Sequence, residues 1–337
     1  MSEIPKNLEL ILEKARELEV KGEHFKAYNR LFFVSIELKR EGYKHLDVLA
    51  EALNQGGIVK RMQGQYDEAL EYYKKAIKLN PGNEQKSLAE INMADIYRVG
   101  KSDFDEAHAC LKNAHLLAKK IPNEKNRGIV HAKLEDQKGL VFLAQEKYKN
   151  AIKSYQDAIE ICDYLTEKYP DDKENENRFG QALHHIGVAY LRLKDPKKAN
   201  EAYGLQIRAR DFFESLGDKQ GIVNSESALG EISMIKKEPD DAIKHYEKAM
   251  NLLKETGYER GKTAMALNFA EAYLTKGNLD EAKGYLEEFR NGVNNKTVTE
   301  HDIKLMQNRF FKVIELYDSH NLNIDEFKQC TLNYNHT

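Results

Sequence analysis

Apolar and small residues recur along the chain at helical spacing, most clearly over residues 53–81. The pattern predicts two helices there, over Leu53–Met62 and Asp67–Leu79. Gln63-Gly64-Gln65 forms the turn between them, and Asn80-Pro81 ends the second helix because proline cannot continue one. A single helix pair of this size cannot bury its own apolar face, so the pattern requires stacked neighbours of the same kind.

The start of each second helix repeats along the whole chain. A turn, followed in most pairs by an aromatic residue or a proline, leads to an alanine. This alanine occurs at seven positions: Ala27, Ala69, Ala107, Ala151, Ala199, Ala242 and Ala282. The intervals run from 38 residues (Ala69 to Ala107) to 48 residues (Ala151 to Ala199). A minimal repeat of this kind has about 34 residues, so the extra length belongs either to longer helices or to longer loops.

The first helix of each pair carries a small residue twelve positions before the alanine. The positions are Ala15, Gly57, Gly139, Gly187, Gly230 and Ala270. In the third pair Ala94 lies thirteen positions before Ala107, one residue out of register. A small residue at a fixed point of every first helix predicts that the two helices of each pair cross closely there.

Residues 53–81 resemble the tetratricopeptide-repeat consensus. Its family positions are occupied by Gly57, Gly64, Tyr66, Ala69, Tyr73, Ala76 and Pro81. The resemblance extends over roughly residues 8–290 and implies an all-α, right-handed superhelical solenoid of about seven helix pairs. An amphipathic segment at about 299–317 is expected to be a C-terminal capping helix. We therefore predict one solenoid over residues 1–320, followed by a tail over 321–337.

Composition excludes several classes of function. Lys and Arg number 52 against 55 Asp and Glu, a net charge of −3 that predicts no nucleic-acid partner. No apolar run is long enough to span a bilayer, and the N-terminal stretch lacks the pattern of a signal peptide. Three scattered cysteines, Cys110, Cys162 and Cys330, favour free thiols in a reducing compartment. We expect a cytoplasmic protein with no membrane contact.

The sequence offers no pattern of catalytic residues. His184 and His185 are adjacent, so on a helix they point about 100° apart and do not share a metal ion. No phosphate-binding glycine loop, nucleophile elbow or zinc-protease motif occurs. Acidic clusters fall in first helical turns, where they stabilise the helix dipole. We therefore predict no catalytic residues, no metal and no cofactor.

One row of polar residues indicates a binding function. Two positions before the small residue, five first helices carry an amide or an imidazole: Gln55, Asn92, Gln137, His185 and Asn268. An amide offers both a donor and an acceptor, as an extended peptide backbone requires. In the tetratricopeptide family the first helices line a concave groove, so the resemblance implies a ladder there, with Arg61, Arg98 and Arg192 beside it. These amides could instead bond to neighbouring helices or water, and the sequence leaves both possibilities open.

Two long repeats, residues 217–232 and 257–282, are similar to the peptide-pheromone receptors of Gram-positive bacteria and to animal spindle-orientation scaffolds. That similarity implies peptide capture in the concave channel through Asn side chains, here Asn92 and Asn268. The first pair begins at about Leu8, which leaves no room for an N-terminal DNA-binding domain or helical bundle. We predict a non-catalytic module that binds a protein or peptide. The alternatives are an intracellular peptide-signal receptor that switches a partner and a regulatory enzyme such as a phosphatase; a homo-oligomer remains open.

Overall fold

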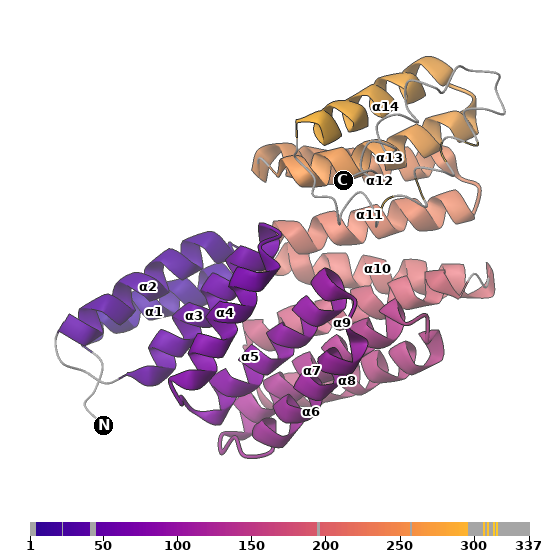
Figure 1. The fold of residues 1–337 in the computed structure, drawn as a ribbon. Helices are drawn as coiled ribbons and strands as arrows, with labels where there is room; N and C mark the ends of the chain where they lie inside the picture. Colours follow the sequence, from indigo (N-terminus) through magenta and orange to yellow (C-terminus); the bar gives the residue numbers. More distant parts are fainter. Residues whose placement is uncertain are drawn as a thin grey trace. The chain divides into compact units, whose positions relative to one another are not determined.

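The computed structural model describes residues 5–21, 23–40, 45–193, 196–256 and 258–295, together with Met306, Arg309, Val313 and Glu315. Across the continuous stretches, the described chain forms fourteen α-helices and one π-helical turn (Figure 1). The first eight helices are α1 (Lys6–Val20), α2 (His24–Arg40), α3 (Leu46–Met62), α4 (Tyr66–Lys78), α5 (Asn83–Ile96), α6 (Phe104–Ala118), α7 (Glu124–Ala144) and α8 (Tyr148–Lys168). The remaining six are α9 (Lys173–Arg192), α10 (Pro196–Leu216), α11 (Lys219–Ile235), α12 (Pro239–Thr256), α13 (Glu259–Lys276) and α14 (Leu279–Asn294).

Contacts divide the chain into two compact units. The described residues within Met1–Lys194 and Arg208–Gly221 form unit 1, and those within Asp195–Ile207 and Ile222–Thr337 form unit 2. Helix α10 therefore contributes its first part to unit 2 and its last part to unit 1. Each unit has its own buried apolar clusters, made where consecutive helices pack against each other.

The predicted crossing point is a glycine packed against a tyrosine ring. A Cβ atom added at Gly57 would lie 2.3 Å from Cε1 of Tyr73, far inside van der Waals contact. The same contact recurs at Gly139 with Tyr155 and at Gly230 with Tyr246, at 2.4 and 2.2 Å. The small residues of the first helices are therefore packing sites, as the sequence predicted.

The turn inside a helix pair also follows one rule. The residue five positions before the repeated alanine has a positive φ angle wherever that angle is described: Gly64 (75°), Ser102 (52°), Glu146 (59°), Lys237 (63°) and Gly277 (80°). Glycine adopts this left-handed conformation without the steric cost that a Cβ atom brings. Only two of these five residues are glycines, so three pairs accept a strained turn.

The register shift of the third pair has a structural cause. Tyr97–Lys101 forms a π-helical turn directly after α5. A π-turn takes one residue more than an α-turn, so it absorbs the extra residue between Ala94 and Ala107. Arg98, predicted to lie in the groove, is part of this turn.

Two details of the prediction change. The first helix of the second pair begins at Leu46 rather than Leu53, because Val48 and Ala52 pack against Leu31 and Val34 of the preceding pair. The helices run from 13 to 21 residues, so at least part of the extra repeat length belongs to them. Most of the expected cap at 299–317, and the tail at 321–337, lie outside the described residues.

Candidate binding face

The first helices of unit 1 form a continuous wall. Helix α3 contacts α5, α5 contacts α7, and α7 contacts α9 (Figure 1). Helix α1 joins α3 through an ion pair between Arg16 Nε and Glu51 Oε1 at 3.1 Å. We call this set of five first helices, α1, α3, α5, α7 and α9, the inner wall. It carries most of the predicted groove residues.

Asp95 on α5 is the centre of a charged network on the inner wall. Arg61 on α3 places Nη1 3.2 Å from Asp95 Oδ2, and Arg98 contacts Oδ1 from the π-turn. Gln137 on α7 donates from Nε2 to the same Oδ1 at 3.1 Å. Burial opposes the charge of Asp95, but the guanidinium groups of Arg98 and Arg61 hold the pKa of this carboxyl well below its usual range. Three of the predicted site residues therefore meet at one carboxylate.

Gln55 also has an intramolecular partner. His24 at the start of α2 lies with Nδ1 3.3 Å from Gln55 Oε1. Burial lowers the pKa of His24 to about 4, and the charges of Arg61, Lys133 and Arg178 add to this effect. His24 is therefore neutral at pH 7. The amides at positions 55 and 137 bond to other helices, which was the alternative that the sequence left open.

A second cluster of ionisable residues on the inner wall joins Glu19 of α1, Lys133 of α7 and Arg178 of α9. Oε1 of Glu19 is fully shielded from solvent and has no hydrogen-bond partner among the described residues, and the same holds for Nε of Arg178. Lys133 on α7 makes no hydrogen bond or ion pair with any described residue. Burial, with the nearby Arg178, lowers the pKa of Lys133 to about 7. Burial, with the carboxylates of Glu51 and Glu174, raises the pKa of Glu19 well above its usual range.

The ends of the inner wall approach each other. Helix α1 contacts α9, where Asn177 Nδ2 donates to the backbone oxygen of Val20 at 3.2 Å. The same amide donates to Asp218 Oδ2 at 3.2 Å. The first and last helices of the inner wall are thus linked at this point.

The remaining predicted residues differ in their surroundings. His185 Nδ1 lies 2.6 Å from Asp136 Oδ1, and its ring lies 5.6 Å from that of Tyr155. Asn92 is half-buried and Arg192 exposed, and neither bonds to another described residue. Asn268 belongs to unit 2, where its Oδ1 accepts a hydrogen bond from Arg309.

The sequence missed Glu19, His24, Arg178 and Arg309 as residues of these faces. Glu19 lies four positions after the small residue Ala15, and Arg61 and Arg98 occupy the same position in their repeats. Comparing this position across the repeats could therefore have identified Glu19. His24 and Arg178 gave no such signal, because their positions follow from how helices of different pairs turn toward each other.

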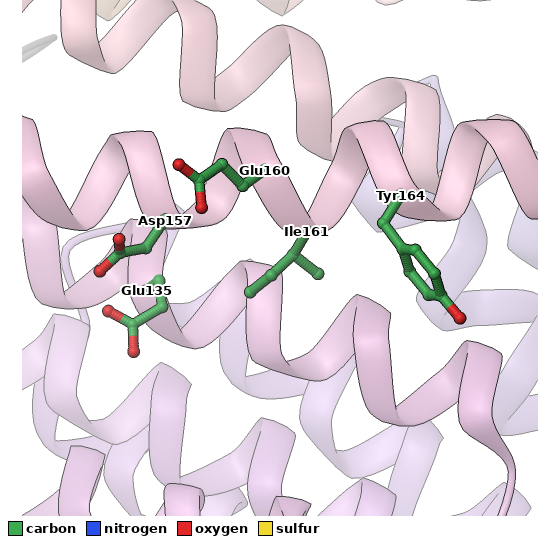
Figure 2. A pocket seen from close by; sticks show the side chains of 5 residues that line it. All are labelled: Glu135, Asp157, Glu160, Ile161 and Tyr164. Carbon is green, nitrogen blue, oxygen red and sulfur yellow. The ribbon is translucent and has the colours of Figure 1, made fainter.

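The surface also carries an open recess between α7 and α8, with a volume of about 380 Å³. Glu135, Asp157, Glu160, Ile161 and Tyr164 line it, as Figure 2 shows. Glu135 already pairs with Lys138 at 3.0 Å.

Within the described residues, no group of three or more His, Cys, Asp and Glu side chains is placed to bind a metal ion. Burial raises the pKa of the thiols of Cys110 and Cys162 to about 12, which removes their nucleophilicity at neutral pH. None of the helices in the described part of the chain combines the length and apolarity needed to cross a bilayer.

Family models of the tetratricopeptide repeat match residues 50–83 and 136–163. The chain carries tetratricopeptide repeats. Both matches fall on helix pairs described above, α3–α4 and α7–α8, and the all-α repeat fold predicted from the sequence is confirmed.

The fold is similar to solved tetratricopeptide-type structures. A Rap protein in complex with Competence and Sporulation Factor matches with a TM-score of 0.63 at 16% identity, covering 98% of each chain. Aspartyl phosphate phosphatase F from Bacillus subtilis matches with a TM-score of 0.59 at 14% identity, covering 95% of this chain and 83% of that one. At these identities the likeness concerns the fold alone.

A curated relative is RNA polymerase-associated protein CTR9 from Caenorhabditis elegans, 26% identical over 214 residues. The match covers 62% of this chain and spans only 16% of that protein. The repeats support a role as a protein-interaction scaffold, since stacked repeats of this type present extended concave binding surfaces.

Proposed function

We propose that the chain is a non-catalytic scaffold, acting in the cytoplasm, that binds a segment of a partner protein on the inner wall of unit 1. The observation that carries the proposal is that Asn92, Lys133 and Arg192 on the inner wall make no hydrogen bond or ion pair with any described residue. A polar group left without a hydrogen bond in a buried interface costs about 1 to 3 kcal/mol, so a segment that bonds to these three side chains is favoured over one that merely covers them. Asn92 and Arg192 are the predicted wall residues that have side chains available to such a ligand.

In this proposal the Asp95 network stabilises the wall and does not contact the partner. Its three partners come from α3, the π-turn and α7, so it holds adjacent first helices in register. A preorganised wall loses less conformational entropy when a segment binds. Arg61, Arg98 and Gln137 therefore position the wall, and Gln55 does so through His24. Asn92, Lys133 and Arg192 contact the partner.

The partner's chemistry follows from the wall. Burial raises the pKa of Glu19 and lowers that of Lys133, so the charged form of each group is disfavoured until a partner of opposite charge binds. A segment with a carboxylate beside an apolar residue would restore the full charge of Lys133 and pair with it. We infer an extended partner segment with apolar anchors and mixed charge.

A peptide-signal receptor is the second candidate. It is favoured by the likeness in fold to the Rap protein that was solved in complex with Competence and Sporulation Factor. That match covers 98% of each chain. In this reading a peptide on the inner wall changes the contact between Val20 and Asn177 and so alters the surface offered to a partner. A spin-label distance between α1 and α9 that changes on peptide addition would favour this candidate over a static scaffold.

Photo-crosslinking tests the scaffold proposal directly. A benzophenone side chain is placed at Asn92 or Arg192 on the inner wall, and at exposed Lys149 or Lys112 on the second helices α8 and α6 as controls. We expect the two inner positions to capture the same partner in cells and the two controls not to capture it. Capture of the same partner with equal yield from all four positions, or from the controls alone, would refute the inner wall as the site.

A further inference from the structure

In unit 2 the first helices α11 and α13, whose shared surface we call the inner face of unit 2, contact an arginine from the C-terminal part of the chain. Arg309 Nη2 lies 2.7 Å from Glu231 Oε1 on α11, and its Nε lies 3.7 Å from Glu271 Oε2 on α13. Its Nη1 donates to Oδ1 of Asn268. One guanidinium thus contacts two carboxylates and an amide.

Glu231, Asn268 and Glu271 lie at fixed positions relative to the small residue that recurs in each first helix. Asn268 lies two residues before Ala270, at the position of the amide row. Glu231 and Glu271 each directly follow the small residue of their helix, Gly230 and Ala270. Corresponding positions in successive repeats face the same way, so Arg309 lies on the surface that a ligand of this fold would use.

Apolar residues accompany the arginine. Val313 is completely buried in the cluster formed by α13 and α14, and Met306 packs against the same cluster. Met306, Arg309 and Val313 are all helical and follow an i, i+3, i+7 spacing, which places them on one face of a helix. The part of the chain that contacts this surface therefore presents an arginine between two apolar residues.

The charges show that the site is built for a guanidinium. Glu231 and Glu271 would repel each other if no cation lay between them. A planar guanidinium has donors that reach both carboxylates and the amide at once, whereas an ammonium is a point charge. Arg309 and Glu231 keep about a quarter of their side-chain surface exposed, 29% and 25%, so solvent reaches this ion pair and a competing cation can enter.

We propose that the inner face of unit 2 is a second binding surface, that Glu231, Asn268 and Glu271 form its arginine subsite, and that the chain's own segment around Arg309 is an internal competitor. The partner is a helical protein segment with an apolar residue, an arginine three positions later and an apolar residue four positions after that. Ten residues, 296–305, separate Asn295 at the end of α14 from Met306 in the sequence. A tethered competitor acts at a high effective concentration, so the partner must bind tightly or the tether must be released.

A peptide of residues 303–317 with a fluorescent label serves as the probe, and binding to the full chain is followed by anisotropy. The unsubstituted chain is expected to bind it weakly, because the internal segment occupies the surface. Arg309→Ala in the chain should increase peptide affinity at least tenfold. Adding Glu231→Gln and Glu271→Gln to that variant should reverse the gain.

Two matched controls define the subsite. A peptide with alanine at position 309 should bind the Arg309→Ala chain at least tenfold more weakly, and one with lysine there should fall between the two. Asn92→Ala in unit 1 should leave peptide binding unchanged, which separates this surface from the function proposed for unit 1.

Two results would overturn the proposal. If the chain carrying Arg309→Ala, or the milder Arg309→Lys, loses thermal stability and still binds no peptide, the segment is a permanent structural cap. If the alanine peptide binds as tightly as the arginine peptide, the surface is apolar and has no arginine subsite.

Discussion

At the scale of single residues, the repeats are matched pairs rather than independent positions. Where the first helix has glycine, as at Gly57, Gly139 and Gly230, the residue sixteen positions later is a tyrosine that fills the space. Where it has alanine, the residue sixteen positions later is smaller: Leu31 after Ala15, Cys110 after Ala94 and Leu286 after Ala270. The volume at the crossing point is thus shared between two side chains, as close packing requires.

Gly57→Ala should destabilise the protein by about 1 to 3 kcal/mol, despite alanine's higher helix propensity, because the new Cβ atom overlaps the Tyr73 ring. The double variant Gly57→Ala/Tyr73→Leu copies the Ala15–Leu31 pair and should show a favourable coupling of about 1 kcal/mol or more in a denaturation cycle.

Gly284→Ala on α14 is the control for that cycle, since nothing lies within 4 Å of its Cβ position. It should be neutral or stabilising by up to about 1 kcal/mol. Additive effects of the Gly57 and Tyr73 substitutions would show that the two residues do not share one space.

His24 gives the fold a pH dependence. Its folded-state pKa of about 4 lies below the ordinary histidine value, so between about pH 6.5 and pH 4 the unfolded chain binds a proton that the folded chain does not. Stability should therefore be lost as the pH falls through this window, by a few kcal/mol at most. His24→Gln keeps a polar side chain beside Gln55 without the titration, and its melting temperature should fall less steeply over the window. Equal slopes for both proteins would remove His24 as the cause.

At the scale of helices and turns, much of the structure could be predicted from the sequence. The repeated alanines, the small residues and the polar turns are local signals that mark each helix pair. The start of α3 was misplaced because Val48 and Ala52 are fixed by contacts with the preceding pair, which no local pattern records. The role of Asp95 was missed for the same reason: its partners come from three separate segments.

The left-handed turn residue gives a test at this scale. Gly277→Ala forces a Cβ atom into a left-handed conformation where no side chain interferes, so it should cost about 1 kcal/mol. Lys237→Gly relieves the same strain in another pair and should be neutral or stabilising by less than about 1 kcal/mol. Chemical denaturation measures both. A loss of stability in Lys237→Gly as large as that in Gly277→Ala would contradict the turn rule.

At the scale of the whole molecule, the two units present inner faces of different character. In unit 1, Glu19 Oε1 and Arg178 Nε are buried without a hydrogen-bond partner among the described residues, and burial lowers the pKa of the nearby Lys133. Unit 2 carries two carboxylates that share the single guanidinium of Arg309. The sequence predicted one amide row through both units, and that row gives no sign of which side chains contact it in each of them.

The central claim is that the inner wall of unit 1 binds a protein segment, and one affinity measurement tests it most directly. Peptides are selected against the full chain from an unbiased display library, and the dissociation constant of each is measured by calorimetry. We predict that Lys133→Met and Asn92→Ala each weaken binding at least tenfold without changing the melting temperature of the protein. The control Lys149→Ala should bind the peptides with unchanged affinity. Equal affinity for all four proteins would contradict the account.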